Sequence, residues 1–248
     1  MKYLLSQACL SIPARLARER TLCAFDFDGT LSPIVAHPDQ AAMRVRTRNL
    51  LHRLAPLYPC IVVSGRARTN VLNKLSGISF AQVIGNHGAE TGAAQKSRHL
   101  VEQWKAALEL ALGQVPGLWV EDKGFSLAVH YRQASEKVET RRCILAATGA
   151  LKKVRVFGGK QVVNVVMDCA PNKGDAVAAE RDRLGCDWVL YVGDDENDED
   201  AFALEGNIVA VRIGRKLRSH ARYYLRNQGE IDELLELLVR LRAPVAPA

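Results

Sequence analysis

Phe25-Asp26-Phe27-Asp28-Gly29-Thr30-Leu31 joins an apolar run, residues 21–25, to a Gly-Thr turn. The run is short and uninterrupted, which predicts a buried strand. Side chains alternate between the faces of a strand, so Asp26 and Asp28 leave its end on the same side. Two neighbouring carboxylates repel each other unless a cation lies between them. The motif therefore indicates a Mg²⁺ site, with one carboxylate also available as a nucleophile. By itself, the stretch also fits a solvated Asp-Gly turn.

The composition is that of a globular chain. Its 248 residues, 48% of them hydrophobic, can form one large domain or two modest ones. No apolar stretch approaches the roughly 18 residues of a membrane helix, and residues 1–13 lack the long apolar segment of a signal peptide. We therefore expect a cytoplasmic protein without membrane contact. The six cysteines are scattered, and Cys23, Cys60 and Cys169 lie in apolar runs, which favours buried free thiols over disulfides or zinc.

The formal net charge of +7 suits an anionic ligand. It also fits nucleic acid or a membrane surface. However, the basic residues are spread out, with small clusters at 44–48, 141–142 and 212–226, and aromatic residues make up only 6% of the chain. We expect a small anionic substrate, no nucleic-acid partner and a monomeric chain.

Strand and helix patterns alternate through the first part of the chain, at 41–57 (helix), 60–63 (strand), 67–75 (helix) and 81–84 (strand). The two strands run into Ser64-Gly65-Arg66 and Gly85-Asn86-His87-Gly88-Ala89-Glu90. This alternation predicts a right-handed parallel α/β unit. Such sheets carry their functional groups outside the carboxyl ends of the strands, so we expect these motifs to converge on Asp26.

Residues 92–169 interrupt this pattern. The expected elements are a helix, a hairpin, a second helix and a second hairpin turned at Gly158-Gly159, at 94–112, 118–132, 136–148 and 154–166. We therefore predict an α/β fold with a Rossmann-like parallel-sheet core, residues 1–91 and 170–248, and an inserted α+β cap domain, residues 92–169. Hinges are expected near Thr91-Gly92 and 168–171.

The α/β pattern then resumes with a helix to about 184, a strand at 188–192, a short helix from 201, a last strand at 207–211 and a helix at 231–241. The strand at 188–192 ends in Gly193-Asp194-Asp195-x-x-Asp198. Crowded carboxylates are unfavourable without a divalent cation. We expect Asp26, the main-chain carbonyl of Asp28, Asp194 and Asp198 to form the Mg²⁺ site. An acidic helix N-terminus is the alternative, and it explains Asp198 better than Asp194.

Four further residues fit a phosphate group. Ser64 and Arg66 offer a hydroxyl and a guanidinium, and Gly65 allows close approach of a main-chain N–H. Lys173 opens a helix, where the helix dipole repels its charge, so it is expected to point at an anion. Taken alone, Ser64-Gly65-Arg66 also fits an ordinary turn.

Together these residues resemble the haloacid dehalogenase superfamily of phosphatases, whose four ordered motifs are matched at 26–31, 64, 173 and 193–198. The resemblance implies that Asp26 attacks phosphorus and forms an aspartyl-phosphate. Asp28 would protonate the leaving oxygen and then activate water. Mg²⁺ and Lys173 would offset the charge on the phosphoryl group.

Longer motifs are similar to the trehalose-6-phosphate phosphatase family: Asp-Phe-Asp-Gly-Thr-Leu-Ser-Pro-Ile, Gly-Asn-His-Gly-Ala-Glu and Glu121-x-Lys123-x-x-Ser126-x-x-x-His130-Tyr131-Arg132. This resemblance implies a C2B-type cap that closes over the core. Its sugar-binding residues would be Asn86 and His87 on the core side, and Glu121, Lys123, His130 and Asn164 on the cap. Without the resemblance, Glu121 and Lys123 would fit a charge pair on an exposed hairpin.

The chain departs from the family pattern at the second hairpin. Asn164 stands where the family usually has Glu, and Val166-Met167 where it has Arg-Pro. A neutral amide bonds a hydroxyl at roughly half the strength of a charged group. We expect Mg²⁺-dependent hydrolysis of trehalose 6-phosphate, with a phosphatase for another sugar or polyol phosphate as the alternative. A non-catalytic sugar-phosphate sensor is a third possibility. Such a protein would be expected to lack catalytic residues, whereas Asp26, Asp28, Lys173 and the acidic motif are all present.

Overall fold

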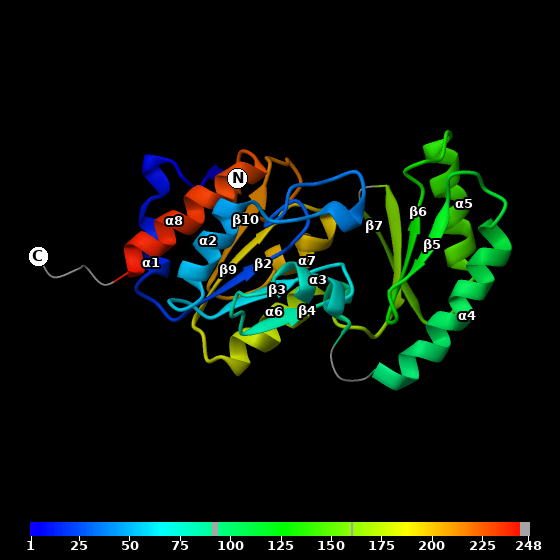
Figure 1. The fold of residues 1–248 in the computed structure, drawn as a ribbon, viewed down its shortest axis with the longest axis horizontal. Coiled ribbons are helices and arrows are strands. Elements are labelled where there is room, and N and C mark those ends of the chain that lie inside the picture. The colour runs from blue at the N-terminus through cyan, green and yellow to red at the C-terminus, as the bar shows by residue number, and fades with distance from the viewer. Residues whose placement is uncertain (91–93, 160, 244–248) are drawn as a thin grey trace, which may run out of the picture.

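The computed structural model describes residues 1–90, 94–159 and 161–243. Within these ranges, seven strands form a parallel sheet and four form a separate antiparallel sheet (Figure 1). The strand order of the parallel sheet is β1-β11-β10-β9-β2-β3-β4. In that order the strands span Lys2–Tyr3, Tyr223–Leu225, Ile208–Ile213, Trp188–Gly193, Thr21–Phe25, Cys60–Val63 and Gln82–Ile84.

Helices cover both faces of the parallel sheet, which explains why its strands are continuous apolar runs. Cys23 and Phe25 of β2 pack against one helical layer, and Leu22 and Ala24 pack against the other. The first layer comprises α1 (Ser11–Leu16), α2 (Val45–Leu54), α3 (Arg68–Lys74) and α8 (Ile231–Arg242). The second comprises α6 (Lys173–Arg183) and α7 (Glu199–Phe202).

The antiparallel sheet lies beside the core and has helices on one face only (Figure 1). Its order is β5-β6-β8-β7, with spans Trp119–Asp122, Leu127–His130, Val162–Met167 and Val154–Gly159. Alternate residues such as Val129 and Val163 pack against α4 (Ala94–Leu112) and α5 (Lys137–Gly149). The intervening residues, including Asn164, are left for the face toward the core.

The predicted architecture of a parallel core sheet and an α+β cap is confirmed. The expectation of a last strand at 207–211 is wrong, because β10 extends to Ile213 and β11 follows it. β1 and α1 were not predicted from the sequence. β1 and β11 have only two and three residues, too few to show a periodic pattern.

Three local expectations need correction. The helix predicted at 41–57 is α2, which begins at Val45 because Arg44 is still extended, with ψ 150°. Gly158 and Gly159 do not form a turn; they pair with Val163 and Val162 inside the β7–β8 ladder. The short helix after β9 begins at Glu199 rather than 201.

All six cysteines are free thiols. Cys23 and Cys60 are buried as neighbours on β2 and β3, but Cys169 is exposed, contrary to expectation. The proposed hinge at Thr91-Gly92 lies outside the described residues.

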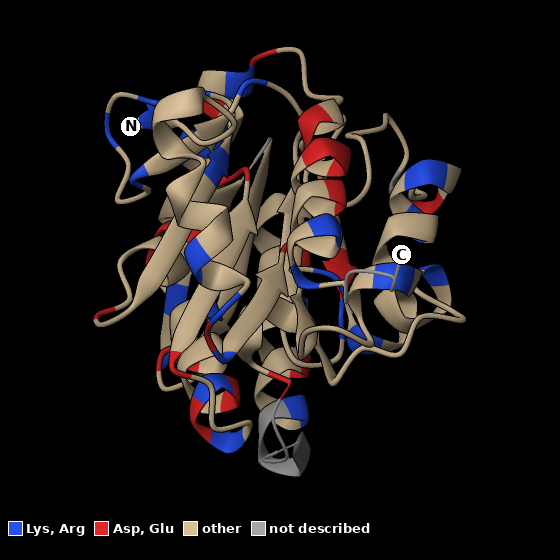
Figure 2. Ribbon diagram, turned by 90° about the vertical axis from the view of Figure 1, so that its left-hand side faces the viewer, with Lys and Arg blue, Asp and Glu red and all other residues tan. Residues whose placement is uncertain are grey.

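Blue and red segments are interspersed over the side of the core shown in Figure 2. Charge of both signs therefore covers this side. Across 1–90, 94–159 and 161–243, no helix is both long and apolar enough to span a membrane.

Packing of α8 on the sheet supplies a test of the core. Leu234 is fully buried in the larger apolar cluster, whereas Leu217 is 96% exposed. Leu234→Ala leaves a cavity and should lower the free energy of unfolding by about 2–5 kcal/mol, whereas Leu217→Ala should change it by less than about 0.5 kcal/mol. Urea unfolding followed by circular dichroism measures both. Equal losses in the two variants would contradict this description of the core.

Candidate active site

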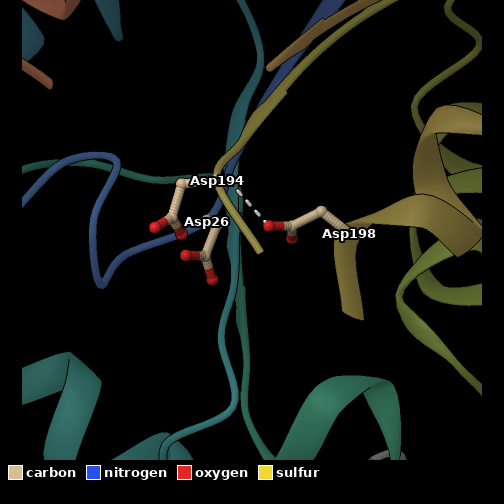
Figure 3. A group of neighbouring side chains, drawn as sticks. All are labelled: Asp26, Asp194 and Asp198. Atoms are coloured by element: carbon tan, nitrogen blue, oxygen red, sulfur yellow. Dashed lines mark hydrogen bonds between the residues drawn. The ribbon is translucent and has the colours of Figure 1, made fainter. Parts of the chain in front are cut away.

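Three buried carboxylates meet at the carboxyl edge of the parallel sheet (Figure 3). Asp26 follows β2 and Asp194 follows the neighbouring strand β9, while Asp198 ends a short 3₁₀ turn, Glu196–Asp198. The Asp26 N–H donates to the Val192 carbonyl at 2.9 Å, which continues the ladder beyond the strands. One oxygen from each carboxylate lies within 4.8 Å of the others. The strand ends therefore converge as the sequence predicted.

Lys173 is the buried cation of this cluster. Its Nζ donates to Asp26 Oδ1 and to Asp198 Oδ1, both at 2.7 Å, and the side chain is 1% exposed. Burial alone lowers the pKa of Lys173, but the two carboxylates outweigh it and raise that pKa above its ordinary value. The two carboxylates therefore stabilise the charged form of Lys173.

Asp198 is saturated with donors. Oδ1 accepts from Lys173 and from the Tyr191 hydroxyl at 2.7 Å, while Oδ2 accepts the main-chain N–H groups of Asp194 and Asp195, both at 2.9 Å. Burial raises its pKa, but these donors, led by Lys173, hold the pKa below its ordinary value. A carboxylate has about four acceptor positions, so Asp198 is suited to orienting Lys173 and the acidic loop rather than to direct metal binding.

Asp26 and Asp194 are the better candidates to hold a divalent cation. Burial raises the pKa of Asp26 well above its ordinary value, and Lys173 opposes that rise only in part. A second positive charge would favour the ionised form, and carboxylate oxygens are the ligands that Mg²⁺ prefers. The donor set therefore fits such an ion.

Gly29 makes room for the Asp194 carboxylate. Its φ is +84°, and a Cβ at this position would lie 2.1 Å from Asp194 Oδ2. Any side chain here would both strain the backbone and displace the carboxylate. The glycine of the Asp-x-Asp-Gly motif is thus required by the packing of the acidic cluster.

Asp28 turns to a different partner from Asp26. Arg66 donates Nε to Asp28 Oδ2 and Nη2 to Asp28 Oδ1, both at 2.7 Å, and donates Nη1 to Asn70. The Asp28 carboxylate is not part of the three-carboxylate cluster among the described residues. Its main-chain carbonyl as a metal ligand stays a prediction.

A cavity of about 300 Å³ lies between the core and the cap. Ten of the sequence-predicted site residues line it: Asp26, Asp28, Gly65, Arg66, His87, Glu121, Lys123, His130, Asn164 and Asp194. Ser64, Asn86, Lys173 and Asp198 are buried behind its wall. The first group borders the cavity, whereas the side chains of the second do not line it.

Asn86 joins the core to the cap rather than facing the cavity. Its Nδ2 donates to the Lys123 carbonyl at 3.3 Å, and its Oδ1 accepts from the Ser126 hydroxyl at 2.8 Å. Lys123 in turn donates Nζ to the Gly65 carbonyl at 3.0 Å. These bonds hold the β5–β6 hairpin against the loop expected to bind phosphate. The prediction of direct sugar contact by Asn86 is not supported by this placement.

The surroundings of His87 favour its neutral form. Its ring packs over Gly65, where a Cβ would lie 2.4 Å away, and meets the edge of Phe157 at 4.8 Å between ring centres. Burial, with repulsion from Lys123 and Lys173, lowers its pKa well below 6.5. Asn86 and His87 both have positive φ, 51° and 58°. Such strain in non-glycine residues is typical of functional sites.

Comparison with known proteins places the chain in a family. A model of the trehalose-phosphatase family matches residues 24–221. The chain belongs to the trehalose-phosphatase family. A Mycobacterium marinum protein named trehalose-phosphate phosphatase is 34% identical over 223 residues, covering 82% of this chain and 56% of that protein. The chain thus spans about half the length of that relative.

Other family comparisons cover more of both chains. A rice protein named probable trehalose-phosphate phosphatase 9 is 28% identical. The alignment covers 94% of this chain and 73% of the rice protein. The solved C-terminal domain of trehalose-6-phosphate phosphatase from C. albicans superposes with a TM-score of 0.81, 22% identity and coverage of 97% and 98%. The match confirms the expected fold.

Some residues that support the site could not be recognised from the sequence patterns. Tyr191 is hidden in the apolar sequence of β9. Arg212, 7% exposed, donates to the carbonyls of Asp194 at 2.6 Å and Asp195 at 2.9 Å. A charged residue inside the apolar run 208–213 was the available signal. Trp119, which lines the cavity, was missed because it opens the hairpin before the recognised motif.

Val166 stands where the family usually has Arg, but the neighbouring strand carries an arginine at the same level. Arg155 of β7 lies directly across from Val166 of β8, and its Nη2 donates to the Pro171 carbonyl at 3.5 Å. A guanidinium is therefore present at this level of the cap sheet, on the adjacent strand. Asn164 keeps its predicted place in the cavity wall.

Two glycines form a matched pair for testing the acidic cluster. Gly29 and Gly124 have φ of +84° and +81°, but a Cβ at 124 meets nothing within 4 Å. Alanine at either position should cost about 1–3 kcal/mol of stability through backbone strain. Only Gly29→Ala should also weaken Mg²⁺ binding, by about tenfold or more, because it displaces Asp194. Isothermal titration calorimetry with Mg²⁺ makes the comparison; equal affinities would contradict this role of residue 29.

Because His87 has a lowered pKa in the folded chain, we expect the protein to lose stability in mild acid. The folded chain keeps it neutral, whereas the unfolded chain takes up a proton as the pH falls through about 6.5. The free energy of unfolding should therefore decrease below pH 6.5, by up to about 1.4 kcal/mol per pH unit from this group. His87→Asn, which tolerates positive φ, should flatten this slope between pH 6.5 and 5. His52→Asn, at an exposed position, should leave it unchanged.

Proposed function

We propose that this chain hydrolyses trehalose 6-phosphate to trehalose and phosphate in a Mg²⁺-dependent reaction. The observation that carries the proposal is Asp26, bonded to Lys173 at one end of a cavity whose other wall is the polar face of the cap. A carboxylate held by a buried ammonium is a suitable nucleophile for phosphorus. Family membership and the names of the relatives support the choice of substrate.

Asp26 begins the proposed reaction. Lys173 holds Oδ1 at 2.7 Å, which leaves Oδ2 to attack phosphorus. The P–O bond to the sugar breaks, and an aspartyl-phosphate forms. Asp28 gives its proton to the leaving sugar oxygen, then takes a proton from the water that hydrolyses the aspartyl-phosphate. Asp26 and Asp194 would hold the divalent cation, which would neutralise charge on the phosphoryl group.

Arg66 positions Asp28 in the cavity wall. Its guanidinium donates to both carboxylate oxygens of Asp28, each at 2.7 Å. A phosphate in the cavity competes for the same fork of N–H groups. Substrate binding is therefore expected to loosen the Asp28–Arg66 pair, which leaves an Asp28 oxygen available to the leaving group.

The runner-up is a phosphatase of the same architecture for another sugar or polyol phosphate. Asn164 favours it, since this cavity-lining amide replaces the carboxylate expected from the family. A non-catalytic sensor is less well supported, because Asp26, Lys173 and Asp198 form a complete hydrogen-bonded set.

Phosphate release tests the proposal. Wild type should hydrolyse trehalose 6-phosphate in preference to glucose, mannose and sucrose 6-phosphates, and a chelator should abolish the activity. Asp26→Asn should lower kcat by about 1,000-fold or more, since it removes the nucleophile. Asp187→Asn, at an exposed position remote from the cavity, is the matched control and should retain full activity.

The outcomes separate the candidates. Metal-dependent hydrolysis of another phosphate but not of trehalose 6-phosphate would keep the chemistry and reject the substrate. Binding of trehalose 6-phosphate with no turnover in Mg²⁺ would favour the sensor.

A further inference from the structure

Trp119 is a large aromatic side chain that is partly exposed to solvent at the cavity. It is 41% exposed and lines the cavity together with Glu121, Lys123 and His130. The other two tryptophans lie elsewhere. Trp104 of α4 is buried in the apolar core of the cap, and Trp188 begins β9. Trp119 is not part of the apolar cluster of the cap, so packing in that core does not account for this exposed indole.

The indole is held in a fixed orientation. It stacks on the His130 imidazole, directly across the β5–β6 ladder, with ring centres 4.5 Å apart and planes 9° apart. His130 Nε2 is fixed in turn by Glu121 Oε2 at 2.7 Å. One face of the indole is therefore covered, and the exposed remainder borders the cavity. A flat, preorganised aromatic surface costs little conformational entropy when a ligand packs on it.

Strand β5 places this surface at a set distance from the core. Residues 119, 121 and 123 share one face of the strand, and the Lys123 N–H extends the ladder by donating to the Ser126 carbonyl at 3.0 Å. Antiparallel strands rise about 3.4 Å per residue, so Trp119 lies about 14 Å along the strand from Lys123. Lys123 contacts the Gly65 carbonyl, next to Arg66. Residues 123, 121 and 119 thus run, in that order, outward from the end of the cavity expected to hold the phosphate.

We propose that Trp119 is a specificity-determining residue that stacks on the sugar ring distal to the phosphate. This inference rests on the proposed function. With its 6-phosphate at Asp26, a single hexose ring is expected beside Lys123 and Glu121 and short of Trp119. The second ring of a disaccharide phosphate would then lie at Trp119. The carbon-bound hydrogens of a pyranose face form an apolar surface that packs on an indole, while its hydroxyls remain free for Glu121 and Asn164.

Kinetics on substituted chains test the stacking. Trp119→Ala should raise KM for trehalose 6-phosphate about tenfold and change kcat less than twofold, because the contact lies far from the reacting atoms. Trp119→Phe should recover most of the loss, since it keeps an aromatic face. Trp188→Phe, a tryptophan remote from the cavity, should leave KM unchanged.

Tryptophan fluorescence gives a readout that a purely structural role would not move. In the inactive Asp26→Asn chain, saturating trehalose 6-phosphate should shift the emission to shorter wavelength as the indole loses water. Glucose 6-phosphate should not cause this shift. The double variant Asp26→Asn/Trp119→Phe should bind trehalose 6-phosphate without it.

Each outcome bears on a separate claim. If wild type hydrolyses trehalose 6-phosphate but Trp119→Ala keeps its KM, or if saturation leaves the emission unchanged, the stacking role is rejected and the proposed function stands. If wild type does not hydrolyse trehalose 6-phosphate, the proposed function fails and the role of Trp119 fails with it.

Discussion

The buried ammonium of Lys173, between the carboxylates of Asp26 and Asp198, is the interaction on which the rest of the site depends. Burying any of these charges alone would be very costly, and removing one partner leaves the others uncompensated. The three residues come from the end of β2, the start of α6 and the turn after β9. Their pairing therefore fixes two strands and a helix N-terminus relative to one another.

Close approach of the backbone makes this arrangement possible. A Cβ on Gly193 would lie 2.3 Å from the Asp198 carboxyl carbon, just as one on Gly29 would overlap Asp194. Main-chain N–H groups then reach Asp198 from two successive residues. Lys173, the Tyr191 hydroxyl and these N–H groups make the crowding of acidic side chains tolerable, and a divalent cation would reduce the repulsion further.

The cap meets the core largely through polar groups. Arg132 donates to the carbonyls of Val35 and Ala36, and Lys123 donates to that of Gly65. Polar interfaces of this kind are typical of domains that move relative to each other. The cap's own core lies on the opposite face of its sheet, among α4 and α5, so the cavity wall can be polar without weakening the cap.

The sequence by itself determined the parallel core, the inserted cap and the acidic cluster. Continuous apolar strands reveal burial on both faces, and Asp26, Lys173 and Asp194 follow or open elements whose type is clear from local pattern. Only the tertiary structure decided which of these residues face the cavity. It placed Asn86 at the joint between core and cap, paired Asp28 with Arg66, and gave Asp198 a full set of donors. It also revealed Tyr191, Arg212 and Trp119. The physical reason is that periodicity reports which face of an element is buried, whereas a hydrogen-bond partner depends on elements far apart in the chain.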